Sequence, residues 1–338
     1  MDMVLSFIEA NRALLGLRDL PKTLSALMLT PRFEASRHVI FLVMASGRPQ
    51  PILVAKTPRV PQFSDHLAHE AHMLQAIQNL RPGGFQSIPQ VITYENYLGH
   101  PILLETALNG QLMSPDLVRS NPARMMQIAM DWLQDVQSNP TEPHDNRWYA
   151  ELVESPLTML RNDFPLTAIE ADLLQRCEEY LAVLKDLSLP YVLQHGDLSH
   201  PNLVLTGHDS IGVLDWELAT IRGLVASDFF FFLSYIAFSV SHANDSGEYV
   251  SAFDEAFFGN KSWMQPHVQA YMTTCNLQSD SFPALFLLCW LRYLVQFIGR
   301  LHVCKTEPIS METANIVRNN RYYAIWKYTV ERFKHLSI

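Results

Sequence analysis

The segment Leu193–Ala219, LQHGDLSHPNLVLTGHDSIGVLDWELA, limits the possible folds of this chain more than any other stretch. Its short apolar runs, bounded by turn residues, are typical of buried strands. Between the runs lie more polar side chains than an ordinary core buries, because a buried polar group without a partner costs free energy. The segment therefore predicts a functional site on loops at strand ends. Its polar residues are His195, Asp197, His200, Asn202, Asp215 and Glu217.

Residues 31–107 have the pattern of strands with one helix between them. The β-branched and apolar runs HVIFLVM (38–44) and PILVAK (51–56) flank the turn cluster ASGRPQ, which predicts a hairpin. Apolar residues at helical spacing predict a helix over 64–80. Two more strands, PQVITYEN and HPILLETA, follow with a turn between them. This part of the chain therefore predicts a small α+β lobe.

From about Pro122 onward the pattern is mainly helical, apart from the polar segment described first. The length of 338 residues suits two lobes. We therefore predict an α+β fold with an N-terminal lobe over 1–107 and a larger helical lobe over 108–338. Residues 1–20 have an acid at position 2 and no basic start, which predicts an amphipathic helix and not a signal peptide.

Composition and charge indicate which partners and compartment to expect. A net charge of −9 argues against nucleic acid, whose phosphates need clustered basic residues. Four widely spaced cysteines without a CxxC pair predict reduced thiols in a cytoplasmic protein. The apolar segment 229–240 is too short to span a bilayer, and 282–299 contains Arg292 and Gln296. Both segments predict buried helices, so we expect no membrane partner.

Three residues of the polar segment suggest phosphoryl transfer. Asp197 and Asn202 are five residues apart, and Asp215 follows the strand-like run IGVL. A carboxylate and an amide oxygen suit Mg²⁺, which prefers oxygen ligands and keeps sites for water and phosphate. A second carboxylate can orient a substrate hydroxyl and take its proton. Positioning and charge neutralisation of this kind perform most of the catalysis in phosphoryl transfer.

Two motifs in the segment resemble those of a known family. HGDLSHPN (195–202) resembles the catalytic loop HGDxxxxN of the aminoglycoside phosphotransferase and choline kinase-like family, and IGVLDWE (211–217) resembles its metal-binding segment. Members of that family are small-molecule kinases with a protein-kinase-like fold. The resemblance implies a bilobal kinase that uses ATP and Mg²⁺ to phosphorylate a hydroxyl of a small molecule, such as an amino-sugar, a sugar or an amino-alcohol.

The resemblance also implies roles for single residues. Asp197 matches the catalytic base that orients the acceptor hydroxyl. Asn202 and Asp215 match the Mg²⁺ ligands. In the N-terminal lobe, Lys56 at the end of PILVAK matches the lysine that contacts the nucleotide phosphates. Glu70 on the next helix matches the acid that pairs with that lysine.

The nucleotide-binding part contains one departure from the family pattern. PILLETALNG resembles the strand and hinge that bind adenine through the backbone, with Glu105 to Ala107 as the hinge. The family's phosphate loop is rich in glycine or other small residues, but the loop here, TPRFEASRH (30–38), has no glycine. Ser36 and the backbone beside it are the candidates for a phosphate contact. Glu217 is a candidate for a second metal or the substrate.

Simpler interpretations stay open for the single residues and for the function. A loop Asp–Asn pair is typical of a turn, and a lone lysine or glutamate is typical of a solvated surface. The glycine-free loop suggests an inactive nucleotide-binding regulatory module as one alternative. A metal-dependent hydrolase is the other, and it leaves Lys56 and Glu70 without a role. The order of the motifs from Lys56 to Asp228 favours the kinase.

Overall fold

The computed structural model describes residues 3–30, 38–60, 64–138, 147–258, 262–302 and 308–336. Tertiary contacts divide the chain into two compact units, which are described separately below. The first unit consists of Met1–Met113, His195–Asp197 and Pro201–Ile221. The second consists of Ser114–Gln194, Leu198–His200 and Arg222–Ile338. The lobe boundary between residues 107 and 108 stays a prediction.

The first unit is built on a five-stranded antiparallel sheet with the strand order β1-β2-β3-β5-β4. The predicted hairpin forms β2 and β3, and the two later predicted strands form β4 and β5. β1 lies before the region predicted as strands, and its residues are mostly exposed. The bounds are β1 Leu24–Leu29, β2 His38–Ala45, β3 Pro51–Pro58, β4 Val91–Tyr97 and β5 His100–Thr106.

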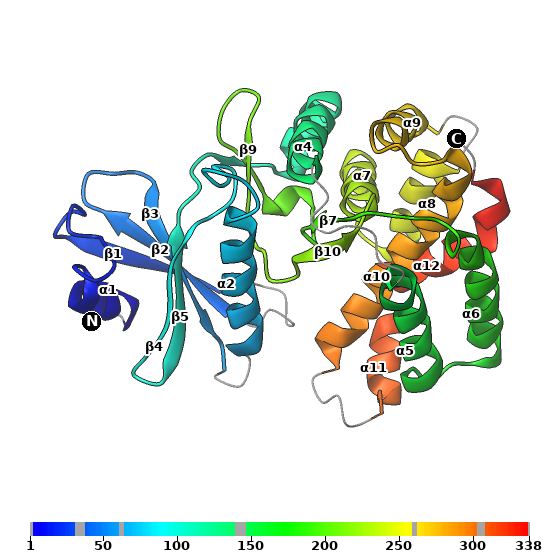
Figure 1. Ribbon diagram of the computed structural model, residues 1–338, viewed down its shortest axis with the longest axis horizontal. Helices are drawn as coiled ribbons and strands as arrows, with labels where there is room; N and C mark the ends of the chain where they lie inside the picture. The colour runs from blue at the N-terminus through cyan, green and yellow to red at the C-terminus, as the bar shows by residue number, and fades with distance from the viewer. Residues whose placement is uncertain are drawn as a thin grey trace. The chain divides into compact units, whose positions relative to one another are not determined.

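Each face of the sheet is covered by one helix of the first unit (Figure 1). α1 (Met3–Asn11) packs with Phe41, Leu53 and Leu104 on one face. α2 (Ser64–Gln78) packs on the other face through residues that contact Leu103. Because side chains alternate along a strand, a polar residue two positions from Leu103 shares the α2 face. This alternation determines which strand residues reach the polar cluster described below.

The predicted N-terminal helix over residues 1–20 is shorter in the structure and ends at Asn11. Gly16 has a φ of +69°, which breaks the helical path. The Arg12 guanidinium donates hydrogen bonds to the carbonyls of Leu20 and Pro21, which holds the following turn. The apolar spacing alone did not indicate this tertiary stop.

The second unit is mainly helical, as predicted for the later part of the chain. Its short strand β7 (Tyr191–Gln194) pairs with β10 (Thr220–Leu224), where the chain passes from the first unit to the second. The helices of at least eight residues are α4 Pro122–Gln137, α5 Ser155–Asp163, α6 Ala168–Leu181, α7 Ser227–Val240, α8 Ser246–Phe257, α9 Gln265–Thr274, α10 Phe282–Leu301, α11 Met311–Arg318 and α12 Arg321–Arg332. The shorter ones are α3 Pro115–Ser120, η2 Ala150–Glu154, η3 Ala182–Leu184, η5 Ser279–Ser281 and η6 Phe333–His335.

The two most apolar segments form the buried helices α7 and α10, as predicted. The four consecutive phenylalanines of α7 are all buried and point to different neighbours. Phe229 stacks on Tyr271, and Phe231 stacks on Tyr293 of α10. Among the described residues, one helical stretch, Ser279–Leu301, is long and apolar enough to cross a membrane, and 72% of its most apolar window is buried within the protein. Such burial is typical of a core helix.

A buried ion pair joins α6 and α11 in the second unit. Arg318 donates from Nε to Glu170 Oε1 at 2.8 Å and from Nη2 to Oε2 at 2.9 Å. The Tyr323 hydroxyl and the Thr167 backbone N–H also donate to this carboxylate. Burial raises the pKa of Glu170, but these hydrogen bonds outweigh burial and lower the pKa to about 2. The ionised carboxylate therefore stabilises this unit.

We expect Glu170→Gln to lower the free energy of unfolding at pH 7 by about 3 kcal/mol. Because the folded pKa lies below the unfolded value of 4.5, the contribution is present above about pH 5 and is lost as the pH falls towards 2. Denaturant titrations at several pH values measure both effects. Glu178→Gln is the matched control, since its exposed pair with Arg161 contributes about 0.5 kcal/mol or less. Equal losses in the two variants would contradict the prediction.

Candidate active site

A small three-stranded sheet in the first unit carries the polar segment. β8 (Leu203–Leu205) pairs with β6 (Gln111–Leu112) and with β9 (Ile211–Val213). Asn202 precedes β8, as the last residue of the turn η4 (His200–Asn202), and Asp215 follows β9 by one residue. The Leu214 N–H donates to the Asn202 carbonyl at 2.9 Å. The hairpin register therefore sets Asn202 and Asp215 beside each other, as the sequence predicted for loops at adjacent strand ends.

His195 holds the loop that contains Asp197 against Leu214, the residue after β9. Its Nε2 lies 2.9 Å from the Leu214 carbonyl oxygen, and the Asp197 N–H donates to its Nδ1 at 3.2 Å. A carbonyl can only accept and an amide N–H can only donate, so the proton is on Nε2 and the imidazole is neutral. His195 is also fully buried, with its ring edge against Trp216. It therefore positions Asp197.

The amide of Asn202 is oriented by Asp197. Its Nδ2 donates to the Asp197 carbonyl at 2.9 Å and to the carboxylate oxygen Oδ2 at 3.3 Å. Because the amide nitrogen is used for these bonds, the amide oxygen is the atom that can serve as a metal ligand. Asp197 itself is half-buried, so its carboxylate stays accessible to a substrate.

The turn at Gly196 cannot accommodate a side chain. Gly196 has a φ of +82°, and a Cβ at this position would lie 2.5 Å from the Leu218 carbonyl oxygen. The positive φ alone disfavours any residue with a Cβ by about 1–2 kcal/mol. The backbone contact adds a clash that only a movement of the loop beside Asp197 can relieve.

We therefore expect Gly196→Ala to lower both the free energy of unfolding, by more than about 2 kcal/mol, and the turnover rate. Gly99→Ala separates the cost of the positive φ from the cost of the clash. Gly99 has a similar φ of +84°, but no atom lies within 4 Å of a Cβ built there. The control should lose about 1 kcal/mol and keep full activity. Denaturant unfolding and kcat are measured for both variants. Full activity in Gly196→Ala would refute the prediction.

Lys56 lies in a buried cluster of carboxylates in the first unit. Its ammonium group pairs with Glu70 of α2 and lies 3.5 Å from Glu105 Oε1. Lys56 is only 4% exposed, Glu70 is fully buried and Glu105 is 3% exposed. Strand register explains Glu105, because Val54 pairs with Glu105 and Lys56 with Leu103, which makes the two charged residues diagonal neighbours on the α2 face.

Glu70 also connects Lys56 to the segment after β9. Its Oε1 accepts a hydrogen bond from the Trp216 backbone N–H at 3.1 Å, as well as the bond from Lys56. Trp216 is fully buried, and its indole N–H donates to the Val213 carbonyl at 2.9 Å. One carboxylate oxygen therefore positions both the lysine and the residue that follows Asp215.

The charges of the cluster shift two pKa values. Burial lowers the pKa of Lys56, but the carboxylates of Glu105, Glu70 and Asp215 raise it by more, so the ammonium stays charged. Burial raises the pKa of Glu105 to about 7, although Lys56 acts to lower it. One lysine therefore does not fully compensate the three carboxylates that surround it.

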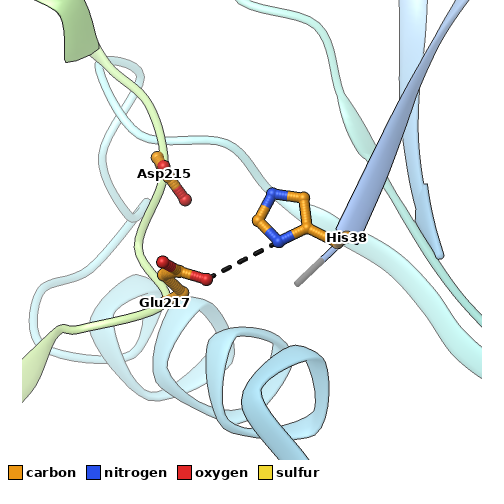
Figure 2. A group of neighbouring side chains, drawn as sticks. All are labelled: His38, Asp215 and Glu217. Carbon is orange, nitrogen blue, oxygen red and sulfur yellow. Dashed lines mark ion pairs between the residues drawn. The ribbon is translucent and has the colours of Figure 1, made fainter. Parts of the chain in front are cut away.

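Asp215, Glu217 and His38 converge at one point of the first unit (Figure 2). Their potential ligand atoms lie within 4.8 Å of one another, and His38 Nδ1 is 3.6 Å from Glu217 Oε2. Asp215 has a φ of +64°, an unusual value for a residue with a side chain. Strain of this kind is typical of functional positions and here fixes the direction of the carboxylate.

This donor set fits a magnesium ion. The Asp215 carboxylate and the Asn202 amide oxygen are hard oxygen ligands, and Glu217 offers a second carboxylate nearby. Mg²⁺ binds few protein groups and keeps several waters or phosphate oxygens, so a pair of protein oxygens is sufficient. His38 is a nitrogen donor and suits Mg²⁺ less, and its contact with Glu217 accounts for its position.

A model of the phosphotransferase enzyme family matches residues 36–267, more than two thirds of the chain. The chain belongs to this family. The match covers both motifs of the polar segment and the strand that carries Lys56, which confirms the resemblance drawn from the sequence. No curated protein sequence matches this phosphotransferase.

Solved structures of several kinases are similar to this phosphotransferase. A GDP complex of wild-type aminoglycoside 2'-phosphotransferase-IIIa is 14% identical with a TM-score of 0.52, and 98% of each chain is covered. The choline kinase LicA from Streptococcus pneumoniae is 9% identical with a TM-score of 0.54, covering 97% of this chain and 99% of that one. APH(3'')-Id from Streptomyces rimosus, with ADP and streptomycin, is 15% identical with a TM-score of 0.51, covering 87% and 99%. At such low sequence identity, the structural similarity is evidence for the fold alone. It confirms the predicted α+β, protein-kinase-like fold.

Two of the predicted nucleotide-binding residues, Ser36 and Ala107, take no part in the contacts described above. Ser36 lies outside the described residues. Ala107 directly follows β5 and is half-buried. The sequence assigned only backbone binding to Glu105 and missed its side-chain contact with Lys56. It also missed His38, whose contact with Glu217 links β2 to the segment after β9 and left no local signal in the sequence.

Proposed function

We propose that this phosphotransferase is a small-molecule kinase that transfers the terminal phosphate of ATP, with Mg²⁺, to a hydroxyl group. One observation carries the proposal: Asn202 donates to the Asp197 carboxylate while its own backbone is hydrogen-bonded to the residue before Asp215. Hydrogen bonds thereby join the candidate base to the hairpin whose ends carry the two candidate metal ligands. Phosphoryl transfer needs this combination of a positioned acceptor and neutralised phosphate charge.

Asp197 is the proposed catalytic base. Its half-buried carboxylate receives one hydrogen bond from Asn202, and His195 holds its backbone. An accessible, oriented carboxylate can accept a hydrogen bond from an acceptor hydroxyl and take its proton as the phosphate is transferred. The role requires only a carboxylate within hydrogen-bond reach of the hydroxyl.

Asp215 and Asn202 are the proposed Mg²⁺ ligands, and Glu217 is the candidate for a second ion. When bound, Mg²⁺ neutralises charge on the phosphates of the nucleotide. The carboxylates near Lys56 favour such a cation, because Glu70, Glu105 and Asp215 together carry more negative charge than one ammonium compensates. Binding of the metal relieves part of this repulsion.

Lys56 is the proposed contact to the nucleotide phosphates, with Glu70 as the residue that positions it. Glu105 to Ala107 is the proposed adenine hinge, and Ser36 a proposed phosphate contact. One of the similar structures is a complex with ADP and streptomycin and another is a complex with GDP, so both purine nucleotides belong in the test. The free cysteines Cys177, Cys275 and Cys289 suit the proposed reducing cytoplasm.

The test is release of ADP from Mg-ATP in the presence of amino-sugars, sugars, amino-alcohols and hydroxy acids, with GTP tested in parallel. We expect a signal that needs an acceptor and disappears when EDTA removes the metal. Nucleotide binding without transfer to any acceptor would favour the inactive regulatory module instead. Tightly bound zinc together with hydrolysis that needs no nucleotide would favour the metal-dependent hydrolase.

A further inference from the structure

A pocket of about 400 Å³ lies within the second unit. It is formed by residues of α3, η4, α7, α8 and α12 and of the loop after α7. A volume of this size suits a metabolite of moderate size. Among the residues that line it are Arg119, His200, Tyr235, His242, Tyr249 and Arg321.

The lining of the pocket is cationic. It contains two guanidinium groups, and none of its described lining residues is an aspartate or a glutamate. Arg119 has an acidic partner in Asp116, but the side chain of Asp116 is 90% exposed, so solvent screens the pair. Arg119 also donates to the Ser239 carbonyl at 3.2 Å, which holds its guanidinium at the pocket wall.

Arg321 is placed where it does not stabilise its own helix. It is the first residue of α12, and a cation at a helix N-terminus opposes the helix dipole. It donates to the Tyr235 hydroxyl and lies over the rings of Tyr235 and Tyr249 at 4.8 and 5.2 Å. No carboxylate of the described residues forms an ion pair with it. Arg119 and Arg321 both line the pocket, so its lining favours a ligand with negative charge.

His200 provides an independent indication of a ligand. It is 6% exposed, and its Nδ1 is buried without a hydrogen-bond partner among the described residues. Buried polar atoms in folded proteins are nearly always hydrogen-bonded, so an unmatched one at a pocket wall is typical of a binding site. His200 also follows Asp197 by three residues, and the covalent chain keeps their Cα atoms within about 11 Å. The pocket wall at His200 is therefore separated from the proposed base by only two residues of chain.

We propose that the pocket binds a carboxylate or phosphate group of the acceptor, so that the acceptor is an anionic hydroxyl compound such as a hydroxy acid or a sugar acid. This inference rests on the proposed kinase function and narrows its acceptor. Guanidinium groups match both oxyanions, because their N–H donors form paired, charge-assisted hydrogen bonds. A cationic amino-sugar or amino-alcohol meets repulsion from Arg119 and Arg321 instead.

The first experiment compares acceptors that differ by one anionic group. The pairs are ethanolamine and serine, glucose and glucuronate, and glycerol and glycerol 3-phosphate. We expect the member that carries the carboxylate or phosphate to have the higher kcat/KM in ADP release at constant ionic strength. The first two pairs report on a carboxylate and the third on a phosphate. Preference for the member without the carboxylate or phosphate, in every pair that is turned over, would overturn the inference while leaving the kinase function intact.

The second experiment uses Arg321→Met and Arg321→Lys. Loss of a charged hydrogen-bond donor should raise KM for the anionic acceptor by roughly tenfold to a hundredfold and leave kcat nearly unchanged. Lysine keeps the charge but not the paired geometry, so Arg321→Lys should recover part of the affinity. Arg161→Met is the matched control, since Arg161 pairs with Glu178 at the surface. Equal KM values in Arg321→Met and Arg161→Met would overturn the inference.

The third experiment tests the pocket without turnover. Sulfate and acetate are added at constant ionic strength, and thermal unfolding is followed for wild type, Arg119→Met, Arg321→Met and Lys56→Met. Selective binding to the folded state raises the unfolding temperature. We expect a rise in wild type and Lys56→Met that is reduced in both arginine variants. Equal rises in all four proteins would show only general salt effects and would overturn the inference. If these anions bind but no acceptor is phosphorylated, the kinase function fails and the anion site stands.

Discussion

Replacing Asp197 by asparagine is expected to lower kcat for phosphoryl transfer by about a hundredfold to ten-thousandfold. The substitution keeps the size and shape of the side chain but removes the charge that accepts the hydroxyl proton. The Asn202 bond to the Asp197 backbone carbonyl does not involve the altered group, so the loop keeps its position. Nucleotide affinity should therefore change little.

Steady-state ADP release measures the loss of kcat, and nucleotide titration measures the affinity for the nucleotide. Asp209→Asn is the matched control, because Asp209 is an aspartate in the turn between β8 and β9 with its side chain 74% exposed. The control should keep wild-type turnover. Transfer at the wild-type rate in Asp197→Asn would remove Asp197 from the role of base.

The second large effect is expected from Lys56→Met. It leaves Glu70 and Glu105 buried without their ammonium partner, and removing one member of a buried ion pair typically costs about 3–5 kcal/mol. Nucleotide affinity should fall as well, because the proposed phosphate contact is lost. Lys327→Met, which breaks an exposed pair with Glu331, should cost less than about 1 kcal/mol.

A double variant separates stability from nucleotide binding. Lys56→Met combined with Glu105→Gln removes one of the stranded carboxylates, so part of the lost stability should return. The phosphate contact remains absent, so nucleotide affinity should stay low. Denaturant unfolding and nucleotide titration of both variants give the comparison. Recovery of nucleotide affinity in the double variant would show that Lys56 acts only as a structural partner.

The features predictable from the sequence were those with a local pattern. The hairpin of β2 and β3 follows from two apolar runs around a turn, and α2 follows from apolar residues at helical spacing. The positions of Asn202 and Asp215 followed from their places at the ends of adjacent short strands. In each case the decisive residues are neighbours in sequence or in one hairpin.

The features that were missed depend on contacts between distant segments. The side chain of Glu105 reaches Lys56 only because β3 and β5 pair in one particular register. Arg12 ends the predicted helix early by binding carbonyls eight and nine residues later. The cationic pocket combines residues from α3, α7 and α12, which no local pattern in the sequence connects. Net charge is a poor guide to the field inside one pocket.

The interleaving of the two units has a consequence for synthesis of the chain. The first unit contains residues 1–113 but also 195–197 and 201–221. On the ribosome, the five-stranded sheet and Lys56 therefore emerge long before the hairpin whose Trp216 N–H binds Glu70. The first unit cannot be completed until all of α3 to α6 has been made. Expression of residues 1–113 alone should give a protein without Asp197, Asn202 and Asp215, so the two units are not separable by cutting at one linker.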